Sequence, residues 1–179
     1  MSISPQTKSR LSKAVIALIL SGASASAILG QFLDEKEGNK LHAYRDGAGV
    51  WTICRGVTVV NGSRVTSGLT LSASECDKIN AAEQEKAIAW VKRNVHVHLT
   101  APQVAGIASF CPYNIGPGKC FPSTFYRKLN AGDRQGACAA IKGWIFDGGR
   151  DCSIRSNDCY GQVVRRDQES ELTCWGLDD

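Results

Sequence analysis

The sequence predicts an α+β fold that combines a small β-hairpin lobe with a mainly helical lobe, with a cleft between them and an apolar helix at the N-terminus. Three observations support this prediction. Residues 14–30 are apolar and uncharged, residues 41–66 are rich in aromatic and β-branched side chains punctuated by glycine, and helical periodicity dominates from residue 70 onward. A cleft between two such lobes is a natural ligand site.

Length and composition suit one compact domain with an appendage. The chain has 179 residues, of which 43% are hydrophobic and 21% are charged, so it can form a packed core. Three of its four net positive charges come from Lys8, Arg10 and Lys13, which leaves a net charge of +1 for the rest of the chain. A nearly neutral body argues against a nucleic-acid partner. We expect a monomer.

The apolar segment follows a basic leader and precedes the acids Asp34, Glu35 and Glu37. Such a profile directs the C-terminal part of a chain across a membrane. Three interpretations remain open, namely a cleaved signal peptide, a stable anchor, and an anchor that enters the bilayer and later leaves it. Ten of the seventeen residues 14–30 are Ala, Ser or Gly, so lipid holds the segment weakly, which argues against a stable anchor.

The sequence contains eight cysteines, and an even number at this density indicates disulfides formed in an oxidising compartment. Zinc would require Cys or His at short spacing, and the chain has no Cys-x-x-Cys pair, so we expect neither a metal nor another cofactor. Eight cysteines allow many connectivities. Proximity in the sequence favours the first two of the pairs named below, and the other two pairs use the cysteines that remain. The candidate disulfides are Cys152–Cys159, Cys111–Cys120, Cys54–Cys76 and Cys138–Cys174.

The hairpin lobe and the segment before it have local signals. Residues 31–38 are expected to form a short helix that ends near Gly38. Residues 41–66 are expected to form hairpins, and the pair Asn61–Gly62 is typical of a tight two-residue turn.

Helix caps mark the second half of the chain. Thr70 or Ser72 can cap a long helix that reaches about Arg93, and Thr100–Gln103 is a capping-box pattern. Further helices are expected at about 101–112, 123–130, 133–146 and 161–174.

Glu37 and Asp46 are the candidate carboxylates for chemistry. Glu37 comes at the end of the first expected helix, Asp46 lies in the first turn or strand of the hairpin lobe, and Thr52 follows. Cleavage of a glycosidic bond needs one carboxyl to protonate the leaving oxygen and another to guide water or stabilise positive charge on the sugar ring. The two carboxyls need different environments. Spacing alone does not single out this pair, because most Glu and Asp side chains are solvated surface charges.

The residues around this pair add a more specific signal. Glu37 before Gly38, Asp46 at the end of Leu41–Asp46, and Thr52 within Val50–Ile53 resemble the catalytic triad of phage-type lysozymes. Two later blocks are similar to this family in the same order, so the resemblance runs from about residue 31 to 176. The first block comprises Tyr113–Gly116, Ser123–Thr124 and Lys128–Gly132, and the second comprises Trp144, Gly148–Gly149, Gly161, Arg165–Arg166 and Glu169.

The resemblance implies a lysozyme-like fold and hydrolysis of the β-1,4 bond between N-acetylmuramic acid and N-acetylglucosamine in peptidoglycan. Glu37 would be the general acid, Asp46 would orient or deprotonate the attacking water, and Thr52 would help to hold that water. Tyr113 and Asn114 are candidates for substrate binding, although Asn114 could instead cap a turn. The alternatives are a lytic transglycosylase, against which Asp46 and Thr52 argue, and a non-catalytic wall-binding protein tethered to the membrane.

The Ala/Ser/Gly-rich composition of residues 14–30 resembles that of endolysins with a signal-anchor-release segment. This resemblance implies a membrane segment at residues 1–30 and a catalytic domain at residues 31–179. The protein would sit in the host inner membrane facing the periplasm and then be released to the periplasm. We expect that tethering holds the Glu37 helix out of register, so that the enzyme is inactive until release.

Two stretches depart from the pattern of the phage-type lysozymes. Arg55 and Val57 occupy positions where the family has other residues, so the hydrogen bonds made there must differ. Asp151–Cys159 is an insertion in the last block. Neither departure changes Glu37, Asp46 or Thr52.

Overall fold

The computed structural model of the protein describes residues 8–177. The first seven residues of the expected membrane segment and the last two of the expected catalytic domain lie outside the described residues. The helices are α1 (Lys13–Leu20), α2 (Ala25–Glu37), α3 (Ala73–Asn94), α4 (Ala101–Ala108), the π-helix η1 (Ser109–Ile115), α5 (Pro117–Cys120), α6 (Thr124–Asn130), α7 (Arg134–Ile141), the 3-10 helix η2 (Arg155–Asn157) and α8 (Gly161–Thr173). The strands are β1 (Lys40–Arg45), β2 (Trp51–Cys54), β3 (Val59–Val60), β4 (Ser63–Arg64), β5 (Phe146–Asp147) and β6 (Arg150–Asp151).

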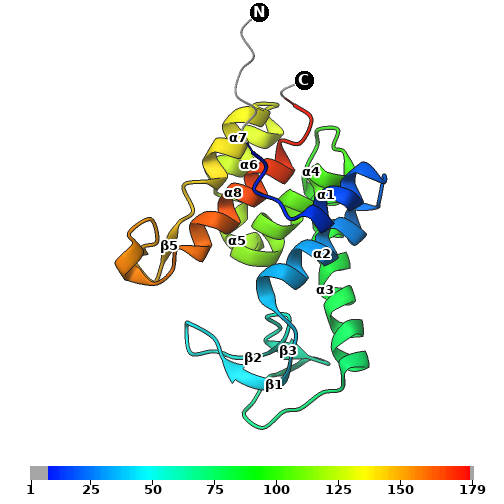
Figure 1. Cartoon of the computed structure of the whole chain (residues 1–179), viewed down its shortest axis with the longest axis vertical. Helices are drawn as coiled ribbons and strands as arrows, with labels where there is room; N and C mark the ends of the chain where they lie inside the picture. Colours follow the sequence, from blue (N-terminus) through cyan, green and yellow to red (C-terminus); the bar gives the residue numbers. More distant parts are fainter. Residues whose placement is uncertain (1–7, 178–179) are drawn as a thin grey trace, which may run out of the picture.

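The helices and the first two hairpins form separate lobes. Figure 1 shows β1, β2 and β3 at one end of the molecule, most helices at the other, and α3 running from one lobe to the other. Strands β1 and β2 pair antiparallel, as do β3 and β4. The turn of the second hairpin is the expected pair, because Asn61 has φ 48° and Gly62 has φ 80°, the left-handed values that a tight hairpin turn requires.

Helix α3 begins where its capping signal predicts. The side chain of Ser72 accepts a hydrogen bond from the Glu75 backbone N–H, and the Glu75 carboxylate accepts one from the Ser72 backbone. These hydrogen bonds lower the pKa of Glu75. Of the two expected caps, Ser72 is therefore the one used. The capping box of Thr100 with Gln103 at the start of α4 is also confirmed.

Two expected helices end earlier than predicted. The helix expected at 101–112 stops being α-helical at Ala108 and continues as the wider η1, which contains Pro112. Proline has no N–H to donate, so it interrupts the α-helical hydrogen bonding. The helix expected at 133–146 ends at Ile141 instead. Beyond it, the positive φ angles of Gly148 and Gly149 form the turn of the β5–β6 hairpin, which the sequence analysis did not predict.

The apolar segment is two helices rather than one. Gly22, with φ 74°, follows the end of α1, and Ser24 caps α2 by accepting a hydrogen bond from Ala27 N. Helix α2 therefore begins at Ala25, not near residue 31, and joins the end of the apolar segment to Glu37 without interruption. No helix among residues 8–177 is both long and apolar enough to cross a membrane.

The helical lobe contains the main core, and the hairpins cover a smaller one. Val15 of α1 and Ile28 and Leu29 of α2 are fully buried in the main core, whereas Leu20 is 76% exposed. The main core also holds large side chains from several helices, including Phe32, Phe110, Phe125, Leu129, Ile141 and Leu172. The smaller core contains Ile53, Cys54, Val57, Val65 and Cys76.

All eight cysteines are paired as expected. The disulfides are Cys54–Cys76, Cys111–Cys120, Cys138–Cys174 and Cys152–Cys159. The first of them ties the end of β2 to α3, and the third joins α7 to the residue that follows α8. The last joins the two cysteines of the insertion Asp151–Cys159, which begins at the last residue of β6.

Candidate functional site

Glu37 is the last residue of α2, and its side chain is 20% exposed. Gly38 follows with φ 64°, a left-handed value that ends the helix and turns the chain toward β1. One carboxylate oxygen of Glu37 accepts a hydrogen bond from the guanidinium of Arg165 in α8. The backbone of α2 and the ion pair with Arg165 therefore both fix the position of the Glu37 carboxyl.

The chain just after β2 also lies against the Glu37 carboxylate. Gly56, just after β2, has φ 79°, and a methyl group added there would lie 3.3 Å from Oε2 of Glu37. That distance is tighter than most contacts of a Cβ atom, so a glycine at this position leaves room for the carboxyl. The backbone at Gly56 thus packs against one side of the Glu37 carboxylate.

Asp46 and Thr52 belong to the first hairpin. Oδ1 of Asp46 accepts hydrogen bonds from the backbone N–H groups of Ala48 (2.9 Å) and Val50 (2.8 Å), which fixes the carboxylate on the turn. Thr52 lies in β2, is only 2% exposed, and donates its hydroxyl hydrogen to the Val50 carbonyl at 2.9 Å. The turn between β1 and β2 therefore orients both residues.

Tyr44 of β1 lies on the first hairpin together with Asp46 and Thr52. It pairs with Thr52 across the β1–β2 ladder and comes two residues before Asp46. Its pKa is raised by burial and by the negative charges of Glu37 and Asp46, so both carboxylates lie within electrostatic range of the Tyr44 hydroxyl. Asp46 and Thr52 therefore lie near Tyr44 on the first hairpin, whereas Glu37 lies against Gly56, in the chain that follows β2.

A buried charge network stands behind Glu37. Glu169 of α8 is fully buried and accepts hydrogen bonds from Arg165 Nε (3.0 Å), from the Arg166 guanidinium and from the Ser109 hydroxyl (2.7 Å). Burial alone would lower the pKa of Arg165, but the carboxylates of Glu169 and Glu37 raise it above its ordinary value. For Arg166, burial has the larger effect and lowers the pKa. Arg165 is therefore a firmly charged partner for Glu37.

The two candidate substrate-binding residues have different surroundings. The Tyr113 hydroxyl donates a hydrogen bond to the Arg55 carbonyl at 2.5 Å, and its pKa is raised by burial and by the charge of Glu37. Oδ1 of Asn114 accepts a hydrogen bond from Arg166. Asn114 is therefore tied to the buried network, and it is exposed at the surface of η1.

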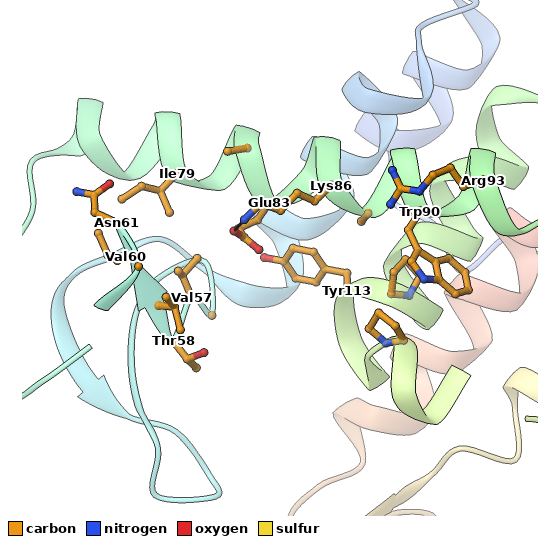
Figure 2. A pocket seen from close by; sticks show the side chains of 17 residues that line it. Val57, Thr58, Val60, Asn61, Ile79, Glu83, Lys86, Trp90, Arg93 and Tyr113 are labelled. Atoms are coloured by element: carbon orange, nitrogen blue, oxygen red, sulfur yellow. Dashed lines mark hydrogen bonds and ion pairs between the residues drawn. The ribbon is translucent and has the colours of Figure 1, made fainter. Parts of the chain in front are cut away.

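A cavity with a volume of about 910 Å³ opens between α3, the second hairpin and η1. In Figure 2, Tyr113 and Glu83 point toward each other across it, with Val57 and Thr58 on the hairpin side. Glu37, Asp46 and Thr52 are not among its lining residues, but Gly56 and Tyr113 are. The cavity therefore begins next to the carboxyl of Glu37 and extends along α3.

Sequence reasoning missed two arginines at this site. The sequence places Arg165 only in a block similar to the phage-type lysozymes, although its position four residues before Glu169 in a helix is a signal for an ion pair. Arg55 was noted only as a departure from the family. It is buried, pairs with Asp34 and donates to Gln84. No sequence signal identified its partners, which come from two separate helices.

The chemistry available here is that of two carboxyls in different settings. One is held at a helix end by a buried arginine, and the other is held on a polar turn by backbone N–H groups. Two carboxyls held on separate elements are the groups that cleavage of a bond between sugars requires.

Comparison with known proteins gives a consistent result. The sequence pattern of the phage lysozyme family matches residues 34–169. The chain is 71% identical over 168 residues to a probable prophage lysozyme of Escherichia coli, covering 94% of this chain and 95% of the relative. It is also 71% identical to the SAR-endolysin of Escherichia phage 933W, with the same coverage.

A solved structure agrees with these sequence matches. The endolysin from Escherichia coli O157:H7 phage FAHEc1 superposes with a TM-score of 0.66 at 29% identity, covering 83% of this chain and 89% of that one. The predicted lysozyme-like fold, with a helical lobe and small β-hairpins, is therefore confirmed. The match over residues 34–169 and the identity to curated relatives establish that this chain belongs to the phage lysozyme family.

Proposed function

We propose that this protein is a muramidase endolysin, a glycoside hydrolase that cleaves the β-1,4 bond between N-acetylmuramic acid and N-acetylglucosamine of peptidoglycan. The observation that best supports this proposal is the position of Glu37 at the end of α2, paired with Arg165 and close to the hairpin that holds Asp46 and Thr52. Membership of the phage lysozyme family and the names of the relatives point to the same activity.

In this proposal the two carboxyls divide the work. Glu37 gives its proton to the glycosidic oxygen as the bond to the sugar carbon breaks. Asp46 accepts a proton from a water molecule, whose oxygen then bonds to that carbon from the opposite face of the ring. The backbone N–H groups of Ala48 and Val50 hold Asp46 in one orientation. The Thr52 hydroxyl already donates to a carbonyl, so its oxygen is left to accept a hydrogen bond from the water.

The cavity beside Glu37 would hold the glycan strand. It combines apolar side chains with the polar groups of Asn61, Glu83 and Lys86, a mixture that suits the flat faces and hydroxyls of sugars. Tyr113 would contact the sugar next to the cleaved bond, because it lines the cavity and because the charge of Glu37 contributes to its raised pKa. Asn114, which is exposed and accepts a hydrogen bond from Arg166, would contact the substrate from the surface of η1.

Product analysis of Glu37→Gln tests the activity. We expect the parent protein to release glycan fragments with a reducing end that has gained one water, and the variant to release none. Glu35→Gln is the matched control, because Glu35 lies two residues earlier on α2 and is exposed. Anhydro-sugar products from the parent would favour the lytic transglycosylase. Undiminished wall lysis by Glu37→Gln would contradict the role of Glu37, and a parent with no cleavage products would favour a wall-binding protein.

The N-terminal segment would control this activity. We propose that residues 1–30 anchor the chain in the host inner membrane with the catalytic domain, residues 31–179, in the periplasm, and that release yields an active monomer in the periplasm. Residues 25–30 and Glu37 share helix α2, so withdrawal of the segment into lipid would move the carboxyl away from Asp46. The core position of Val15, Ile28 and Leu29 offers these side chains an alternative to lipid.

Leu20→Lys separates the membrane state from the released state. Leu20 is 76% exposed in the described structure, so a lysine there should leave the docked form intact, while a charge within a membrane segment is costly. We expect a larger released fraction and earlier host lysis, with unchanged activity of the purified soluble protein. Ala17→Ser, at another exposed position of α1, is the control. Equal activity of membrane-bound and released protein on one soluble substrate would contradict control by tethering.

A further inference from the structure

Arg55 lies where the β2 strand ends, next to the residues that contact Glu37. The preceding residue, Cys54, is tied to α3 by the disulfide with Cys76, and the following residue, Gly56, lies against the Glu37 carboxylate. The Arg55 side chain is 9% exposed. A guanidinium that is this deeply buried needs a partner of opposite charge and acceptors for its hydrogen bonds.

The partners of Arg55 come from two helices. Its guanidinium forms an ion pair with Asp34 of α2 and donates from Nη1 to Gln84 Oε1 of α3 at 2.8 Å. Its backbone N–H donates to Asn80 Oδ1 of α3 at 3.1 Å. Its Nε is buried and has no hydrogen-bond partner within residues 8–177. The charge of Arg55 is therefore compensated by Asp34, whose side chain is 55% exposed.

Gln84 extends this contact to the apolar segment. While its oxygen accepts from Arg55, its Nε2 donates to the backbone oxygen of Ser26 at 3.0 Å. A methyl group at Gly30 would lie 3.0 Å from the same Nε2, so α2 approaches Gln84 closely there. Arg55 and Gln84 together contact α2 from residue 26 to residue 34. These contacts exist only when this part of α2 is packed on α3.

Arg55 also contacts the groups that surround Glu37. Asp34 is one helical turn before Glu37 on α2, so a contact that fixes Asp34 also fixes the rotation of the helix at Glu37. On its backbone side, Arg55 accepts the hydrogen bond of Tyr113, which lines the cavity. The same residue thus joins α2, the chain after β2 and the cavity wall.

We infer that Arg55 is a positioning residue that couples the docking of residues 26–34 on α3 to the placement of Glu37. Its guanidinium holds Asp34 only when α2 is docked, and its backbone keeps Gly56 and Tyr113 in place beside the Glu37 carboxyl. In the anchored state Asp34 would follow the membrane segment and leave Arg55 without its carboxylate. This inference rests on the proposed function and identifies the contact through which release would act.

Kinetics of Asp34→Asn test the inference on released full-length protein. Asparagine keeps the shape of Asp34 but removes the charge that compensates Arg55. We expect kcat on soluble peptidoglycan fragments to fall about tenfold with KM changed less than about twofold, because a small displacement of a catalytic group affects the reaction more than binding. Asp34→Glu, which restores a carboxylate, should recover most of the kcat. Arg55→Lys, which keeps a charge but cannot serve both partners equally, should have an intermediate kcat.

A matched control separates positioning from stability. Arg10→Gln removes another ion pair between the N-terminal region and the body, the one with Asp167. We expect it to leave kcat unchanged at a temperature well below unfolding. Glu37→Gln is measured in parallel, and its full activity would overturn the proposed function itself. If Glu37→Gln is inactive while Asp34→Asn and Arg55→Lys lower only the melting temperature and keep the parental kcat, the positioning role of Arg55 is wrong.

Discussion

Arg165 of α8 donates a hydrogen bond to the carboxylate of Glu37 at the end of α2, although the two residues are 128 positions apart in the chain. The same guanidinium donates a hydrogen bond from Nε to Oε1 of the fully buried Glu169 at 3.0 Å. The orientation of the Glu37 carboxyl therefore depends on a network built from α8, and Arg165 and Glu169 both lie within the residues that the family pattern matches.

Arg165→Gln should impair both activity and stability. The substitution removes the cation beside Glu37 and leaves Glu169 with Arg166 as its charged partner. Loss of one partner from a buried ion pair costs about 3 kcal/mol. We expect a lower free energy of unfolding in chemical denaturation and a large loss of wall-lysis activity. Arg150→Gln, which breaks an exposed pair with Asp147, is the control, and equal behaviour of the two variants would argue against the network.

Gly56→Ala should reduce activity more than stability. The added methyl group would press on Oε2 of Glu37 at 3.3 Å and would also strain a backbone with φ 79°. Gly68→Ala is a matched control, since Gly68 has φ 82° and open space around it. Both variants should lose about 1 kcal/mol of stability from the backbone. Only Gly56→Ala should lose activity when both are assayed well below their melting temperatures, and a similar loss in Gly68→Ala would point to strain alone.

Removal of the Cys54–Cys76 disulfide should affect the site. This bond closes a span of 22 residues and fixes the chain just before Arg55 and Gly56. The double variant Cys54→Ala/Cys76→Ala should lose about 3 kcal/mol of stability and part of its activity. The control is Cys152→Ala/Cys159→Ala, which opens the insertion, where the cysteines are 7 residues apart. Greater loss of activity in the control would show that the insertion matters more to the site than the end of β2 does.

Asp133 should make the stability of α7 depend on pH. Its carboxylate accepts hydrogen bonds from Lys128 Nζ at 2.8 Å and from the Gly136 N–H at 2.9 Å, and these lower its pKa below the ordinary 3.8. Because the pKa of Asp133 is lower in the folded state than in the unfolded state, the carboxylate stabilises the fold at pH values above its pKa in the unfolded chain. This contribution is lost as the pH falls through its pKa in the folded protein. We expect Asp133→Ala to lower the melting temperature at neutral pH and the difference to shrink in strong acid. A difference that stays constant with pH would contradict this role.

Local signals were sufficient where a few adjacent residues decide the structure. Asn61–Gly62 predicted the second hairpin turn because few other residues adopt its positive φ angles, and Ser72 with Glu75 predicted the start of α3 because both partners lie within one turn. Local signals failed at Pro112. The sequence placed this residue inside an α-helix, whereas the chain there forms a π-helix.

From the sequence alone, periodicity and residue type predicted the helical and hairpin segments, and proximity favoured the pairs Cys152–Cys159 and Cys111–Cys120. The lysozyme-like arrangement and the roles of Glu37, Asp46 and Thr52 followed from the resemblance of these motifs to the phage-type lysozymes. Tertiary structure alone decided that Arg165 contacts Glu37 and that Arg55 joins Asp34 to Gln84. It also decided that residues 14–30 are divided between two helices that pack on the body. The physical reason is that a buried charge takes its partners from whichever helices pack around it, and that packing is settled only when the whole chain has folded.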